Sequence, residues 1–227
     1  MTLSKRTTLG FALGVIFLSW IRDLVTGFAD QQVPATFREL VLGVVLVKLV
    51  VLAVIFLLLR LEGERFDALG MSREQWPRRI GAGLLIGLAM FVGLNVAFTA
   101  VMNALIPAPP ATGPTITTFF KDPAHLLAFL PIGIFGGGVV EELQRIFVLT
   151  RFEKWLGRPG LFLGLALTSV MFGVGHLYQG VGSAVSVAVS GLVFGLVYLR
   201  RRSALEPIAA HAFSNVLAMV AATMLAK

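Results

Sequence analysis

Residues 40–59 read LVLGVVLVKLVVLAVIFLLL, a twenty-residue run with one charged side chain, Lys48. As a helix, a run of this length crosses the hydrocarbon core of a bilayer, which is roughly 30 Å thick. The run shows no alternation of polar and apolar residues, and a helix satisfies its backbone hydrogen bonds internally, so a helix is favoured over a barrel strand. This stretch predicts a membrane-spanning helix.

The rest of the chain has the same character. Of its 227 residues, 57% are hydrophobic and only 14% are charged, which does not suit a soluble domain of this size. We expect an all-α polytopic membrane bundle of about seven transmembrane helices enclosing a polar intramembrane cavity. The predicted spans are Thr8–Phe28, Leu40–Leu59, Ile80–Ile106, Leu126–Thr150, Leu161–Leu177, Gly182–Leu199 and Leu205–Ala226.

The net charge of +7 is explained by topology. Most Lys and Arg residues precede the first span or follow the second, fourth and sixth, as expected of cytoplasmic segments. The N-terminus is therefore predicted to be cytoplasmic and the C-terminus outside, in a bacterial-type plasma membrane. No nucleic-acid partner is expected, because no basic groove with interleaved aromatic residues is present.

Two regions are expected along the chain. Residues 1–79 would form two N-terminal transmembrane helices and a basic cytoplasmic loop, and residues 80–227 would form a helical core. Small residues recur four apart, as in Gly83 and Gly87, a pattern typical of close helix packing in lipid. Lys48 is interpreted as a snorkelling side chain, and Asn95 as an interhelical hydrogen-bonding residue.

A few polar residues are hard to explain by packing alone. Glu141, Glu142 and Arg145 follow a triple glycine, residues 136–138, which can loosen or break a helix. On a helix, Arg145 lies one turn from both carboxylates and can neutralise one of them, leaving the other to act as a base. The alternative is that these charges mark the cytoplasmic end of a span and are solvated.

Two further pairs have helical spacing. Phe172 precedes His176 by four residues, and His211 precedes Asn215 by four, so each pair is predicted to share one helix face. Burying such groups in a membrane is costly unless they face one another. A Glu can accept a proton from water, while imidazole and amide groups can hold a divalent metal or stabilise an oxyanion. Both alternatives for the imidazoles remain open.

These motifs, in this order on successive apolar segments, resemble those of the CPBP intramembrane metalloproteases. That group contains type II CAAX prenyl endopeptidases and bacteriocin self-immunity proteins, and the resemblance runs from about Ile80 to the C-terminus. It implies a helical bundle in which Glu141 is the general base and Glu142 lies beside it. The resemblance further implies a site completed by His176, His211 and Asn215, with Arg145 and Phe172 in support. The family usually has its Arg five residues after the first Glu, where this chain has Ile146.

The function implied is cleavage of a peptide bond in a peptide or protein substrate near the membrane surface, by Glu-activated water. His176 and His211 would bind a divalent metal such as zinc if one takes part, and a metal-free site is the alternative. A second hypothesis is a non-catalytic membrane binding or bacteriocin-immunity protein that uses the same cavity. A transporter with a Glu and His proton relay is a third.

Overall fold

The computed structural model describes residues 4–18, 36–71, 74–107 and 116–225. These residues form helices and turns and include no strand, so the predicted all-α fold is confirmed. The elements are α1 (Lys5–Leu18), α3 (Phe37–Leu61), η1 (Phe66–Leu69), α4 (Trp76–Met90), η2 (Phe91–Phe98), α5 (Thr99–Leu105), α6 (Ile116–Phe119), α7 (Pro123–Ile132), η3 (Gly133–Glu141), α8 (Glu142–Val174), η4 (Leu177–Gln179), α9 (Val181–Arg201) and α10 (Leu205–Leu225).

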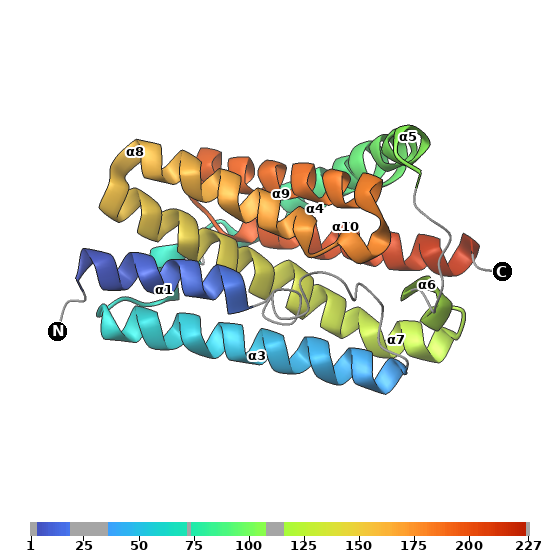
Figure 1. Cartoon of the computed structure of the whole chain (residues 1–227), viewed down its shortest axis with the longest axis horizontal. Helices are drawn as coiled ribbons and strands as arrows, with labels where there is room; N and C mark the ends of the chain where they lie inside the picture. The colour runs from blue at the N-terminus through green and yellow to red at the C-terminus, as the bar shows by residue number, and fades with distance from the viewer. Residues whose placement is uncertain (1–3, 19–35, 72–73, 108–115, 226–227) are drawn as a thin grey trace.

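Five helical runs among the described residues are long and apolar enough to cross a membrane, so the count of seven is not confirmed. The five runs are Phe37–Leu61, Trp76–Leu105, Pro123–Val174, Val181–Arg201 and Leu205–Met224. Residues 19–28 of the first predicted span lie outside the described residues. The 52-residue run from Pro123 contains a non-helical residue, Gly157, with φ 66° and ψ −156°. Figure 1 shows the chain folding back within α8, so that the two legs of α8 run side by side.

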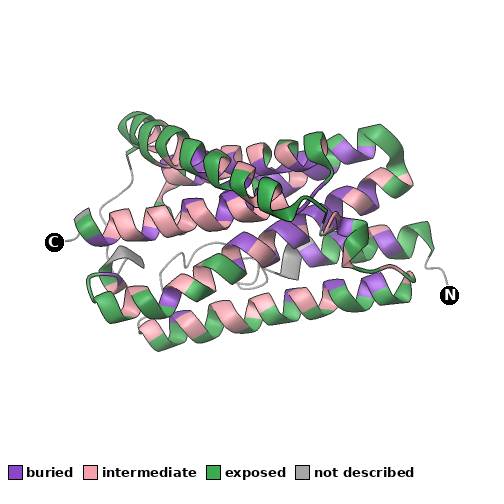
Figure 2. Ribbon diagram, turned by 180° about the vertical axis from the view of Figure 1, so that it is seen from behind, coloured by how far each residue is buried: buried purple, intermediate pink, exposed green. Residues whose placement is uncertain are grey.

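The surface of the bundle carries many exposed apolar side chains, as contact with lipid requires. Figure 2 shows exposed residues along the outer faces of the helices. Many of them are large and apolar, including Leu46, Leu57 and Leu85, which is 71% exposed. Contiguous apolar exposure on this scale is unfavourable in water and is matched by acyl chains. The chain is therefore a membrane protein.

The largest core joins the N-terminal helices to the rest of the chain. Val15 of α1 and Ile55 of α3 lie in one buried cluster with Ile146, Phe147 and Leu149 of α8. Helix α1 packs mainly on α8 and to a smaller extent on α3. The division into residues 1–79 and 80–227 stays a prediction, and the two parts share this core.

Helices α4 and α10 pack through glycine, as the four-residue spacing predicts. A Cβ placed on Gly83 would lie 2.6 Å from the carbonyl oxygen of Glu206, and one on Gly87 would lie 2.5 Å from that of Ala210. No side chain fits at either position, so the two backbones are in direct contact. Asn95 Nδ2 also donates to Ser214 Oγ at 3.2 Å, the interhelical hydrogen bond expected of it.

Candidate active site

The candidate site is built on a π-helix. Residues Gly133–Glu141 form η3, so the triple glycine loosens the helix without breaking it. A Cβ on Gly138 would lie 2.5 Å from Ala212 Cβ, and one on Gly137 would lie 2.3 Å from Asn215 Nδ2. The glycines therefore let α10 lie directly on the backbone of η3. A π-helical turn of this kind is frequent at functional sites, because it redirects the side chains that follow it.

Glu142, the first residue of α8, is fully buried. Its Oε1 accepts hydrogen bonds from the Arg145 guanidinium and from His211 Nδ1, the latter at 2.8 Å. A carboxylate only accepts, so the hydrogen of this bond is on Nδ1 of the imidazole. The bond fixes the orientation of the His211 ring and turns its Nε2 toward the site. No described residue donates to Glu142 Oε2.

Arg145 fills the charge-neutralising role although its spacing differs from the usual one. Its side chain is 3% exposed, and its guanidinium carbon lies 4.9 Å from the ring centre of Phe172 and 5.6 Å from that of Phe194. Ile146, at the position where the family usually has Arg, is instead part of the apolar core. The i, i+3 geometry thus brings Arg145 to Glu142 and leaves Glu141 to another cation.

That cation is Lys48 of α3. Its Nζ lies 2.5 Å from Glu141 Oε1, and its stem passes the position of a Cβ on Gly136 at 3.3 Å. The interpretation of Lys48 as a snorkelling residue is wrong, because its side chain is only 14% exposed and its ammonium is paired with Glu141. The signal was present in the sequence as a single charge in the middle of a twenty-residue apolar run.

The remaining site residues come from α10. The Nε2 of His211 lies 3.8 Å from Glu141 Oε2, and the His211 ring stacks on Phe194 with 4.6 Å between ring centres. Asn215 Nδ2 donates to the Gly133 carbonyl at 3.3 Å. A Cβ on Gly137 would be 3.7 Å from His211 Nε2 and closer still to the Asn215 amide, so both nitrogens face this glycine.

His176 joins the cluster through Phe172 and not as part of a shared helix face. Helix α8 ends at Val174, and His176 lies in the turn before η4. The turn brings its Nδ1 to 2.8 Å from the Phe172 carbonyl, and the two rings meet edge-on at 5.0 Å. The Phe172 ring also meets the His211 ring edge-on, with 5.5 Å between ring centres. Phe172 therefore lies between the two imidazoles.

The donor set does not fit a zinc site. Within the described ranges, no three His, Cys, Asp or Glu side chains are grouped to hold a metal ion. His211 Nδ1 is bonded to Glu142, and the Lys48 ammonium occupies Glu141 Oε1, so a divalent ion there would meet a cation at close range. No mechanistic step is therefore assigned to a metal, and the metal role of His176 and His211 stays a prediction.

Comparison with known proteins supports the resemblance of the motifs. No curated protein and no solved structure matches the chain. A family model does match, over residues 123–217, a range that contains every predicted site residue but not Lys48. The matching model is that of the Rce1-like family, described as type II CAAX prenyl endopeptidase Rce1-like, and residues 123–217 are similar to it.

Proposed function

We propose that this protein is an intramembrane endopeptidase of the CAAX-protease type, which hydrolyses a peptide bond with water activated by Glu141. The observation that carries the proposal is the division of labour between adjacent carboxylates. Glu142 is buried and engaged with Arg145 and His211, whereas the Glu141 side chain is 20% exposed and has Oε2 free of hydrogen bonds from described residues. Of the two carboxylates, Glu141 is the one with an unbonded oxygen on a partly exposed side chain, where a water molecule can bind.

The proposed reaction needs no covalent intermediate with the protein. Glu141 Oε2 takes a proton from water as the water oxygen attacks the scissile carbonyl carbon. His211, protonated with Nδ1–H on Glu142, offers Nε2–H to the developing oxyanion, and the Asn215 amide offers its second N–H from the same side of Gly137. The C–N bond then breaks as the proton held by Glu141 passes to the leaving amine.

Two further residues support this chemistry. Lys48 holds Glu141 Oε1, which leaves Oε2 as the working oxygen. His176 bonds the Phe172 carbonyl through Nδ1, which leaves its Nε2 to hold the attacking water or the substrate. The substrate we propose is a peptide or protein segment at the membrane surface, as the family match suggests.

The test is proteolysis of a library of membrane-proximal peptides by the full-length protein in liposomes. Glu141→Gln is expected to lower kcat roughly 10³-fold, the usual scale for loss of a general base, and His211→Ala to lower it as well. Glu153→Gln, in α8 and bonded to Arg202 instead of to the site residues, is the matched control and should cleave normally. Equal rates for Glu141→Gln and wild type would overturn the assignment.

The non-catalytic binding or immunity hypothesis makes the opposite prediction. It expects the cellular phenotype to survive Glu141→Gln and His211→Ala, and it expects folded wild type to cleave nothing in the library. Metal content of active protein, measured by mass spectrometry, decides between the two alternatives for the imidazoles. Activity at less than one metal per ten molecules would support the metal-free mechanism proposed above, since such activity requires no ion.

We also propose that the N-terminus is cytoplasmic and that the loop after α5 is outside. In Figure 1, α1 begins and α10 ends at opposite ends of the bundle, as an odd number of crossings requires. The chain has no cysteine, so single-cysteine variants label cleanly. Ser4→Cys should be protected from an impermeant maleimide in intact cells, and Leu105→Cys should react with it. The reverse pattern would invert the topology.

A further inference from the structure

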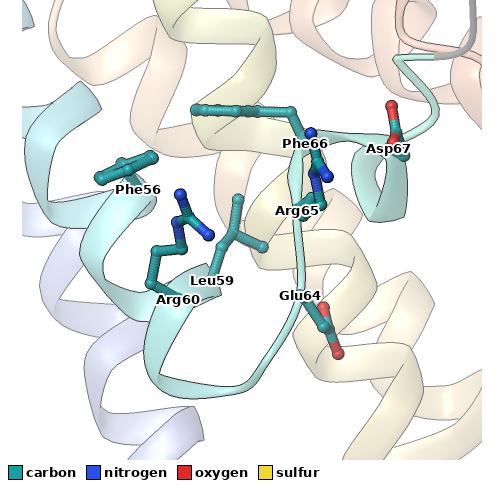
Figure 3. A pocket seen from close by; sticks show the side chains of 7 residues that line it. All are labelled: Phe56, Leu59, Arg60, Glu64, Arg65, Phe66 and Asp67. Atoms are coloured by element: carbon teal, nitrogen blue, oxygen red, sulfur yellow. The ribbon is translucent and has the colours of Figure 1, made fainter.

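A cavity of about 180 Å³ lies at the C-terminal end of α3, and none of the residues that line it belongs to the candidate active site. Figure 3 shows it between the last turn of α3 and the segment that enters η1. Phe56, Leu59 and Phe66 form an apolar wall, and the Phe56 and Phe66 rings stack with 6.3 Å between their centres. The cavity thus has a rigid aromatic side that an apolar group can contact.

Two arginines face this wall. The guanidinium carbon of Arg60 lies 5.2 Å from the Phe56 ring centre. Arg65 lines the cavity from the segment that enters η1. Arg60 and Arg65 are both exposed, and neither guanidinium forms an ion pair or a hydrogen bond with a described residue. Two unpaired guanidinium groups beside one cavity form a geometry suited to an anion with several oxygens, because each can donate two parallel hydrogen bonds.

The nearby acids do not cancel this charge. Glu64 points away from the arginines in Figure 3 and is bound by Arg151 and Lys154 of α8, at 2.5 and 2.8 Å. Burial alone would raise the pKa of the Glu64 carboxyl, but the hydrogen bonds and charges of Arg151 and Lys154 outweigh it and lower the pKa. The negative charge of Glu64 is thus already neutralised by Arg151 and Lys154 of α8. Asp67 remains, on the far side of Arg65 from Arg60.

The position of the cavity selects the anion. Helix α3 is the most hydropathic candidate span, and Phe56, Leu57 and Leu61 at its end are 47%, 56% and 45% exposed. The cavity therefore opens where the apolar surface of the span gives way to a charged loop, at the level of lipid phosphates. We propose that Arg60 and Arg65 bind the phosphate of an anionic phospholipid headgroup, with the acyl chains lying along the exposed face of α3. Free phosphate could bind the same two arginines, but it has no apolar group to contact the apolar wall.

The experiment is native mass spectrometry of the full-length protein, delipidated in detergent and titrated with phosphatidylglycerol or phosphatidylcholine. Wild type is expected to bind one phosphatidylglycerol much more tightly than phosphatidylcholine. The Arg60→Gln/Arg65→Gln double variant should bind phosphatidylglycerol roughly 25-fold more weakly, the scale expected for two basic residues near an anionic lipid. The matched control is Arg78→Gln, an exposed arginine in the first turn of α4 that does not line the cavity.

Several outcomes would overturn the proposal. Equal affinity for the two lipids would remove the need for an anionic headgroup. An equal loss in Arg78→Gln would show attraction to net charge and no built site. Displacement of the lipid by millimolar inorganic phosphate would make free phosphate the ligand. Since both arginines are exposed, the double variant should keep the melting temperature of wild type, which confirms that any loss of lipid is not a loss of fold.

Discussion

The chain contains two clusters of two carboxylates and two Lys or Arg side chains, and they differ in how completely their carboxylate oxygens are bonded. In the loop cluster, Glu62 and Glu64 meet Arg151 and Lys154 near the loop that follows α3. All four carboxylate oxygens there accept hydrogen bonds, with Thr8 bonding the last of them at 2.9 Å. Every carboxylate oxygen of the loop cluster is therefore bonded, and the cluster ties α1, α3 and α8 together.

In the candidate site, the hydrogen bonds to the two carboxylates are incomplete. Lys48 bonds one oxygen of Glu141, and Arg145 shares one oxygen of Glu142 with His211. One oxygen of each carboxylate receives no hydrogen bond from a described residue. Buried polar groups are normally satisfied, so unfilled acceptors beside an oriented imidazole indicate a place where water and substrate are meant to bind.

The largest effect that tests this comparison is expected from Glu142→Gln. In this variant the group bonded to His211 Nδ1 is a neutral amide instead of a carboxylate. The imidazole ring then loses its fixed tautomer, and kcat should fall on the order of 10³-fold. The measurement is kcat per folded molecule, with folding checked by size-exclusion chromatography. Glu62→Gln in the loop cluster is the matched control and should keep kcat. If Glu142→Gln kept the full kcat, as expected for Glu62→Gln, the two clusters would not differ in their effect on catalysis.

The next effect concerns stability. Arg151 is 2% exposed, and Arg151→Met would leave Glu62 and Glu64 with Lys154 alone. Breaking a buried pair in this way should lower the free energy of unfolding by about 3 kcal/mol. Lys154→Met, at a side chain that is 40% exposed, should cost less than about 1 kcal/mol. Denaturation in mixed micelles measures both, and an equal cost would show that burial does not distinguish them.

Lys48→Met tests whether the cation of the site orients the base. Without Lys48, Glu141 can rotate, and a small misplacement of a catalytic group costs on the order of 10- to 100-fold in rate. We expect kcat to fall with KM unchanged, and Lys48→Arg to restore part of the rate. A rise in KM at constant kcat would instead mean that Lys48 contacts the substrate.

The smallest effect is a pH dependence of the loop cluster. The pKa of Glu64 is lowered from its ordinary value of 4.5, since Arg151 and Lys154 outweigh the burial that would raise it. A depressed pKa in the fold adds stability above about pH 4.5, and that stability is lost as the pH falls through the folded value. The difference in melting temperature between wild type and Glu64→Gln should therefore be full at pH 7 and shrink below pH 4.5. A difference that does not change with pH would contradict the ion-pair origin.

The sequence predicted the site better than it predicted the helices around it. Glu141, His211 and Asn215 were expected to meet, because buried polar groups in a membrane need one another. Arg145 was expected to reach one carboxylate, and it reaches Glu142. The count of spans depended on the turn at Gly157, where glycine and Pro159 interrupt a run that is helical on both sides. The predicted helix face of Phe172 and His176 was wrong because α8 ends between them.

The sequence by itself determined that the chain is an all-helical membrane protein and singled out the polar residues of the candidate site. Both follow from local causes, namely the length of apolar runs and the cost of isolated polar groups within them. Only the tertiary structure decided how the charges are shared. Lys48 and Glu141 are 93 residues apart in the chain, and their pairing depends on α3 lying against the bare glycine face of η3. Such contacts arise from the packing of whole helices, and no interval in the sequence encodes them.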